Sequence, residues 1–271
     1  MRVRNSLVAF NGSDGALSAL RYAAELAGDT GHVTALLAHA THEAVDSHAA
    51  WVPAKAREII AQANAEILSE IEARFDIARD ALGMGDRLHF QRASGRVDKV
   101  LSETARSFDL LVAGHDFAER VDAHVMLHPD RIALLSGRPI LMVPKGYEFS
   151  AHPRVVVAWD GGRAAARALS DGRNLLDSQS HLTVLTVGET DAPSSTSDVI
   201  RHLERHGITA IHEKIPADPG VARALLAYCE NQSPSLLVMG AYEHSKFRED
   251  FLGGVTARVL RDAPVPVLLS H

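Results

Sequence analysis

The chain contains two copies of one pattern, in the same order. The apolar run Ser6–Phe10 ends in Asn11-Gly12, and the run Val155–Trp159 ends in Asp160-Gly161. Two further pairs of segments match between the halves: Asp109–Gly114 with Ser235–Gly240, and Gly137–Pro144 with Ala263–Leu269. Three matches in one order indicate a duplicated domain, so both halves should fold by the same rules.

The length agrees with two modest domains. A chain of 271 residues suits two cores of roughly 130 residues each better than one large core. We predict a first domain over residues 1–146 and a second over residues 152–271, with the linker near Lys145–Pro153.

Short segments rich in Val and Leu alternate with helical patterns in both halves. The expected strands are Ser6–Phe10, His32–His39, Arg87–Arg92, Leu110–Ala113 and Ile140–Val143, and then Val155–Trp159, His181–Val187, Thr209–Ile215, Leu236–Met239 and Val267–Leu269. This alternation predicts an α/β fold with two tandem, doubly wound, parallel five-stranded sheets. The last strand of each half is short and flanked by Pro, which is typical of an edge that must be covered.

The helix after the second strand differs most between the halves. In the first half it should run from about Pro53 to Arg79, whereas its counterpart, about Ser197–His206, is much shorter. The long helix carries apolar residues at three- and four-residue spacing: Ile59, Ile60, Ala63, Ile67, Ile71 and Phe75. We expect Ser94 or Gly95 to cap the next helix, and Asp218 to cap one that begins with Pro219.

Composition excludes several classes of protein. The net charge of −6 and the pI near 6.2 provide no basic surface for nucleic acid. Cys229 is the only cysteine, so no disulfide can form within the chain, and its apolar helical surroundings predict a packed, inert thiol. No apolar run approaches the ~18 residues of a membrane span, and we expect a cytoplasmic protein.

Ligands of an open parallel sheet bind outside the carboxyl ends of its strands, where the strand order reverses. The residues after the first, second and fourth strand of each half are therefore the ones of interest. The Val-x-Val-Ala-x-Asp-Gly opening from Val155, the segment Gly240–Leu260 and the closing Ala263–Leu269 resemble the universal stress protein family in its tandem form. The resemblance covers essentially the whole chain. It implies two adenine-nucleotide alpha hydrolase-like sheets related by a pseudo-two-fold axis, with their last strands meeting at the domain interface.

Nucleotide-binding members of that family carry a glycine motif after the fourth strand: Gly, two residues, Gly, nine residues, Gly, then Ser or Thr. Glycines let backbone N–H groups approach phosphate oxygens, and the next helix presents its positive end. Gly240 fits the first position and Gly253 the third, but Glu243 replaces the second glycine and Gly254 replaces the hydroxyl residue. The Glu243 carboxylate should repel a triphosphate.

The resemblance implies a contact between adenine and the Asp after the first strand. Asp160 keeps this residue in the second domain, whereas Asn11 replaces it in the first, and the stretch Ala118–Pro129 holds no glycine. Any ATP or AMP should therefore bind the second domain. The contacts so implied are Asp160, Val187, Gly240, Gly253, Gly254 and Thr256.

Structural interpretations of the same residues stay open. Asn, Asp and Gly are what a strand-to-helix turn requires, Gly253 and Gly254 could serve close packing, and Ser13 is better explained as a helix cap than as a nucleophile. No catalytic constellation appears, so we expect no enzyme, with slow ATP hydrolysis left open.

Three functions remain on the sequence alone. The first is a stress-response protein that acts through protein contacts and binds nucleotide weakly at most, and the second is a true ATP or AMP binder. The third is a metal site at the first-domain sheet edge, where imidazoles and carboxylates gather without a rigid ligand spacing. These residues are His39, His42, Glu43, Asp46, His48, His115, Asp116, Asp122, His124 and His128. A tandem chain could act as a monomer, but we expect a homodimer.

Overall fold

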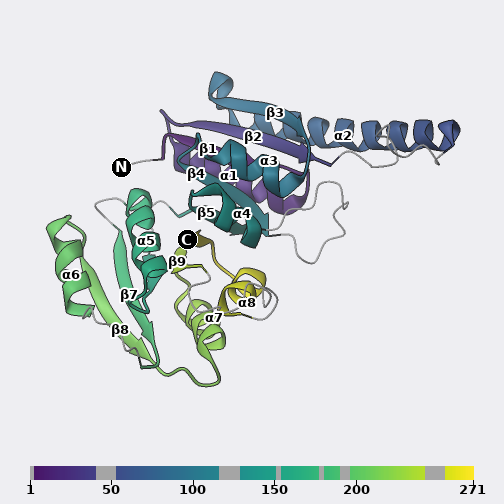
Figure 1. Ribbon diagram of the computed structural model, residues 1–271. Helices are drawn as coiled ribbons and strands as arrows, with labels where there is room; N and C mark the ends of the chain where they lie inside the picture. The colour runs from purple at the N-terminus through teal and green to yellow at the C-terminus, as the bar shows by residue number, and fades with distance from the viewer. Residues whose placement is uncertain are drawn as a thin grey trace.

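The structure is a computed structural model that describes residues 3–40, 53–115, 129–150, 154–176, 180–189, 196–241 and 254–271. Within these residues ten strands form one sheet in the order β3-β2-β1-β4-β5-β10-β9-β6-β7-β8 (Figure 1). The first half supplies β1 (Asn5–Ala9), β2 (His32–His39), β3 (Leu88–Ser94), β4 (Leu110–His115) and β5 (Ile140–Pro144). The second half supplies β6 (Arg154–Ala158), β7 (His181–Val187), β8 (Ala210–Ile215), β9 (Leu236–Gly240) and β10 (Val267–Ser270).

The two halves join through their last strands. β5 and β10 pair antiparallel, with Leu141 opposite Leu268, while every other pairing in the sheet is parallel. Each half keeps its own five-stranded parallel order, and the two orders mirror one another about this junction. The prediction of two parallel sheets whose last strands meet is confirmed, and the junction makes them one continuous sheet.

Helices cover both faces of the sheet. One face carries α1 (Asp14–Ala27), α2 (Ala54–Leu82), α5 (Arg163–Gly172) and α6 (Thr196–Arg205); the other carries α3 (Val97–Ala105), α4 (Pro129–Ser136), α7 (Val221–Gln232) and α8 (Val255–Asp262). Single 3₁₀ turns follow α2 and α5, at Gly85–Arg87 and Arg173–Leu175. Side chains alternate along each strand, so Val8 packs under α1 and Leu7 under α3, and both apolar layers run through both halves.

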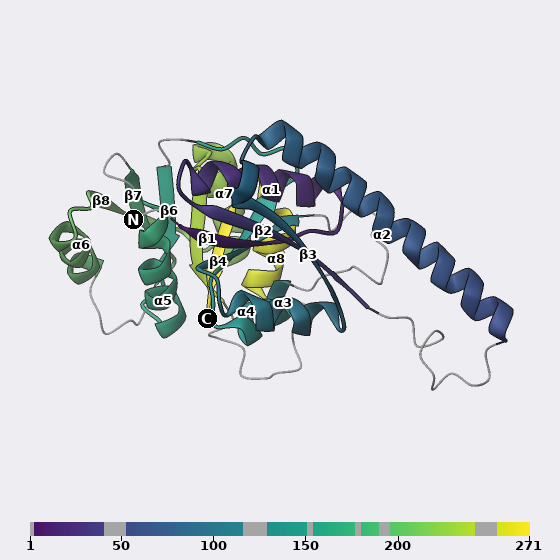
Figure 2. The same ribbon diagram turned by 90° about the horizontal axis from the view of Figure 1, so that it is seen from above.

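Helix α2 is longer than the sheet it covers. Its 29 residues span about 44 Å, whereas the seven residues of β3 span about 23 Å. Its buried residues are therefore Ile71 and Phe75 near the C-terminal end, and Ile59 is 59% exposed, so the predicted apolar stripe is wrong for the N-terminal part. Figure 2 shows that part extending past the strands. No helix of the described residues is both long and apolar enough to cross a membrane.

Two predicted helix caps are wrong. Ser94 stays in the β3 ladder opposite His39, so Arg96 precedes α3 without a side-chain cap. Asp218 and Pro219 lie in a turn closed by the hydrogen bond from the Gly220 N–H to the Ala217 carbonyl, and α7 begins after it. Gly220 has φ +129°, a conformation that L-residues rarely adopt, so the chain redirects there.

The only cysteine is a core residue. Cys229 is 1% exposed on α7, and burial raises the pKa of its thiol to about 12. The thiol is therefore protonated at neutral pH, which confirms the prediction of a packed, inert side chain.

Candidate functional site

The turns that follow β1 and β6 have the same backbone conformation. Gly12 has φ +77° and Gly161 has φ +79°. The Asn11 Oδ1 accepts from the Ser13 N–H at 3.1 Å, and the Asp160 Oδ1 accepts from the Gly162 N–H at 2.8 Å. Both Asx residues therefore close the turn, as the structural interpretation requires, and in Asp160 this uses one oxygen of an exposed carboxylate.

In the first half, side chains of the chain itself satisfy the start of α1. The Ser13 Oγ accepts from the Ala16 N–H at 3.1 Å, which confirms Ser13 as a helix cap. Asp14, the first residue of α1, pairs with Lys145 at 2.9 Å and with Arg74 at 2.6 Å. Hydrogen bonds from Lys145 and Arg74 hold the pKa of the Asp14 carboxyl below its usual value.

Helix α2 packs directly on this turn. A Cβ added to Gly12 would lie 2.9 Å from the Ile71 Cγ1, and Ile71 is only 6% exposed. The apolar side chain covers the backbone of the turn. In the first half an apolar side chain therefore lies against the turn at which the resemblance implies the adenine contact.

The second half leaves the corresponding helix starts without side-chain caps. Gly162 precedes α5 and Gly254 precedes α8, and neither position has a side-chain cap hydrogen bond. Arg163, the first residue of α5, stands where the first half has Asp14. No atom lies within 4 Å of a Cβ added to Gly254. Uncapped helix N-termini with a cation beside one of them favour a bound anion.

The predicted first motif glycine has a packing role. A Cβ on Gly240 would lie 2.6 Å from the backbone carbon of Ala164 in α5, and a Cβ on Gly114 would overlap the backbone of Gly15 in α1. The Ala241 N–H already bonds to the Ser270 carbonyl at 2.8 Å. Because Gly114 shows the same requirement in the half whose following stretch, Ala118–Pro129, holds no glycine, close helix packing explains Gly240. A phosphate contact near Gly240 stays a prediction.

The sheet order brings three of the predicted residues to one edge. Asp160 follows β6, Val187 ends β7 and Gly240 ends β9, and β6 lies between the other two strands. Val187 is partly buried against the apolar layer under α7. Thr256, in the first turn of α8, is 6% exposed.

Two residues of the predicted glycine motif lie outside the described residues. These are Gly253 and Glu243. The site that the structure describes therefore consists of the turn after β6, the end of β7 and the start of α8.

Of the ten residues predicted as metal-ligand candidates, His39 and His115 lie in the described part of the chain, and the other eight lie outside it. Burial, and then the charge of Arg92, lower the pKa of His39. Among the described residues no group of three His, Cys, Asp or Glu side chains could hold a metal ion.

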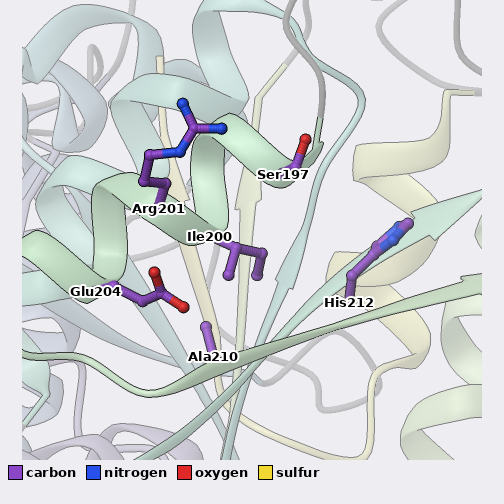
Figure 3. A pocket seen from close by; sticks show the side chains of 6 residues that line it. All are labelled: Ser197, Ile200, Arg201, Glu204, Ala210 and His212. Carbon is purple, nitrogen blue, oxygen red and sulfur yellow. The ribbon is translucent and has the colours of Figure 1, made fainter.

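A groove between α6 and β8 was not predicted from the sequence. Its volume is about 500 Å³, and Figure 3 shows its lining residues Ser197, Ile200, Arg201, Glu204, Ala210 and His212. No sequence motif marks this groove. A comparison of aligned residues in the two halves, which differ here in size and polarity, could have found it.

Comparisons with known proteins agree on one family. Residues 152–271 match the model described as the universal stress protein family. The universal stress protein Slr1230 of Synechocystis sp. is 26% identical over 289 residues, which cover 98% of this chain and 99% of the relative. The crystal structure of a universal stress protein from Archaeoglobus fulgidus has a TM-score of 0.69 at 18% identity, and 98% of each chain is covered. At that identity the structural likeness shows the fold alone.

Proposed function

We propose that the chain is a tandem two-domain member of the universal stress protein family and a stress-response regulator that binds adenine nucleotide in its second half only. The observation that carries the proposal is the contrast between the two equivalent turns. Ser13, Asp14 and Ile71 fill the first, whereas Gly162, Arg163 and Gly254 stand at the second. At the second turn, Asp160 offers a carboxylate for adenine, and neither Gly162 nor Gly254 places a side-chain cap in the way of a phosphate.

Each group at the second site would have a separate role. The Asp160 carboxylate would accept a hydrogen bond from the adenine amino group, and Val187 would line the base. The N–H groups of the first turn of α8, beginning at Val255, would donate to phosphate oxygens. Glu243 would weaken triphosphate binding, so the nucleotide would act as a weak regulatory ligand.

Binding rather than turnover is the proposed activity. The Cys229 thiol is buried and protonated, and the Ser13 hydroxyl is engaged at the start of α1. Neither side chain offers a nucleophile. Slow ATP hydrolysis is the second candidate, favoured only by the uncapped helix starts at the second site. The chain has one cysteine and an acidic net charge, and this composition supports our proposal that it acts in the cytoplasm.

Protein contacts would carry the output, and we propose a second copy of the chain as one partner. Ile59 and Ile77 on α2 are 59% and 72% exposed. They are 18 residues apart, about five helical turns, so they lie on the same side of the helix. Light scattering at micromolar concentration should give a mass above that of the 29.2 kDa chain, and the mass should fall to that value in Ile59→Glu/Ile77→Glu. A wild-type mass near 29.2 kDa would reject the dimer.

Calorimetry with ATP, AMP and adenosine tests the nucleotide proposal. Asp160→Asn keeps an oxygen for the turn but offers an amide N–H₂ group to adenine, as Asn11 does in the first half. We expect this variant to bind all three ligands roughly tenfold more weakly than the wild type. Asn11→Ala is the matched control and should leave every affinity unchanged. Equal binding by wild type and Asp160→Asn would refute the assigned adenine contact.

A further inference from the structure

The groove between α6 and β8 occupies a position that the first half fills with aromatic side chains. The pairing register sets the equivalence: Ala35 lies opposite Phe90, and its counterpart Val184 lies opposite His212. Two residues earlier, on the same face of the strand, Leu88 corresponds to Ala210 in the same way. On one face of its third strand, the second half therefore has Ala210 and His212 where the first half has two large apolar side chains.

In the first half these side chains form a packed cluster under α2. The Phe75 ring contacts the Phe90 ring at a centroid distance of 4.7 Å and the Phe10 ring at 5.8 Å. Phe75 is 1% exposed and Leu88 is 5% exposed. The long helix α2 and the aromatic side chains therefore pack against each other on this face of β3.

In the second half the ten-residue α6 covers a strand with smaller, more polar side chains. Figure 3 shows Ile200 pointing from α6 toward β8, with Ala210 and the Glu204 carboxylate near one end of the groove and His212 near the other. A hollow of about 500 Å³ lies within the range of small-molecule sites, roughly 300–1,000 Å³. Its apolar floor and polar rim are also typical of such sites.

The charges on the rim select the class of ligand. The Arg201 guanidinium points away from Ala210 in Figure 3, and it pairs with Asp198 at 3.3 Å. The Glu204 carboxylate reaches toward Ala210 and has no ion pair among the described residues. The His212 Nε2 is 3.2 Å from the Thr186 Oγ1. Of the two charged residues that line the groove, Arg201 already pairs with Asp198, which leaves the Glu204 carboxylate as the charge for a ligand.

We propose that the groove between α6 and β8 binds a small organic amine with an apolar or aromatic body. The body lies on Ile200 and Ala210, in the space that corresponds to Leu88 and Phe90, and the ammonium group pairs with Glu204. The site is on the α6 face of the outermost strand, whereas the proposed nucleotide site is at the carboxyl ends of β6, β7 and β9. The two proposals therefore stand or fall separately.

Two probes of matched shape and opposite charge test the proposal on the full chain. 2-Phenylethylamine should bind, and phenylacetate should bind at least roughly fivefold more weakly, the size expected for one exposed charge pair. Amide chemical shifts in a two-dimensional NMR titration should change on α6 and β8. Trp159, which shares the apolar layer of Val199 and Leu203 of α6, gives a fluorescence readout in a Trp51→Phe background. Saturating ATP should leave the amine affinity unchanged.

Two variants test the charge of Glu204 and the volume of the groove separately. Glu204→Gln should remove the preference for the amine, and Ala210→Leu/His212→Phe should abolish binding while raising Tm, because it restores the apolar side chains of the first half. If the double variant does not fold, Glu204→Gln alone decides the charge assignment. Absence of binding by the amine, equal binding of both probes to the wild type, or shift changes confined to other elements would overturn the proposal.

Discussion

In the first half a side-chain cap, an ion-paired Asp and an apolar side chain surround the turn after β1, whereas in the second half Gly162 gives the turn after β6 no side-chain cap. The two turns agree in φ at their glycines, 77° and 79°, and in their Asx hydrogen bond. What differs is the surroundings: Ser13, Asp14 and Ile71 on one side, Gly162 and Arg163 on the other. The Asx-Gly turn is therefore a feature of the fold, whereas the side chains around it decide whether a ligand can bind there.

A second contrast runs along the faces of the sheet. Phe75 and Phe90 fill the space under α2, while His212 and Ala210 leave a groove beside α6. At both places, side chains of the first half occupy space in which the second half has smaller or differently charged residues.

The largest effect should come from the two packing glycines. Gly114→Ala should destabilise the fold by about 3 kcal/mol, because its Cβ would overlap the backbone of Gly15, and Gly240→Ala should cost about 2–3 kcal/mol. Gly254→Ala, with open space around its Cβ, should cost only about 0.5 kcal/mol. Urea unfolding measures all three. A cost at Gly240 as small as that at Gly254 would assign Gly240 to the ligand instead of to packing.

Glu243→Gly should strengthen ATP binding by roughly tenfold to a hundredfold, since it removes a like charge from the phosphate loop predicted by the sequence. Adenosine, which has no phosphate, should gain much less, and calorimetry with both ligands gives the ratio. Glu204→Gln removes a carboxylate elsewhere in the second half and is the control. An unchanged ATP affinity in Glu243→Gly would make the loop structural.

The helix caps of the two halves can be exchanged: one variant removes the side-chain cap of α1, and another adds a cap to α5. Ser13→Ala should destabilise the protein by about 1 kcal/mol, because the Ala16 N–H loses its acceptor. Gly162→Ser should stabilise it by a few tenths of a kcal/mol by capping α5, and it should also weaken ATP binding by competing for the same N–H groups. Thermal unfolding and calorimetry measure the two effects. Stabilisation without any loss of ATP affinity would show that the start of α5 is not part of the site.

Asp14→Asn should have the smallest effect, a fall in Tm of roughly 1–2 °C at pH 7, because the pairs of Asp14 are half exposed and screened by water. The folded-state pKa of Asp14 lies below its usual value of 3.8, so its contribution is present above that value and is lost as the pH falls through the folded-state pKa. The Tm difference should therefore shrink as the pH falls below 3.8 and disappear once Asp14 is protonated in the folded state as well. A difference that persists after this protonation would mean that packing, and not charge, is responsible. Asp76→Asn on α2 is the exposed control.

Much of the fold could be predicted from the sequence, because burial on both faces makes parallel strands continuous apolar runs. The strands His32–His39 and His181–Val187 match the structure residue for residue. The extent of burial along α2 could not be predicted, because periodicity shows which side of a helix is apolar but not how much of the helix the sheet covers. The cap at Gly220 was missed for a similar reason: an Asp-Pro pair also starts turns.

Some features of the candidate site could also be predicted from the sequence, and others could not. Asp160, Val187 and Gly240 follow neighbouring strands, so their meeting at one edge follows from strand order. The pairs that Asp14 forms with Arg74 and Lys145 join three separate elements, and no local pattern could predict them. The packing role of Gly240 likewise depends on how closely α5 approaches β9.

The central claim is that nucleotide binds one half of this chain and not the other. Photo-crosslinking with 8-azido-ATP, followed by peptide mapping and by the stoichiometry of bound nucleotide, tests it most directly. We predict one nucleotide per chain at saturation, with crosslinks confined to residues 154–271 and reduced in Asp160→Asn at subsaturating nucleotide. Crosslinks shared equally between the two halves, or a stoichiometry of two, would contradict the account.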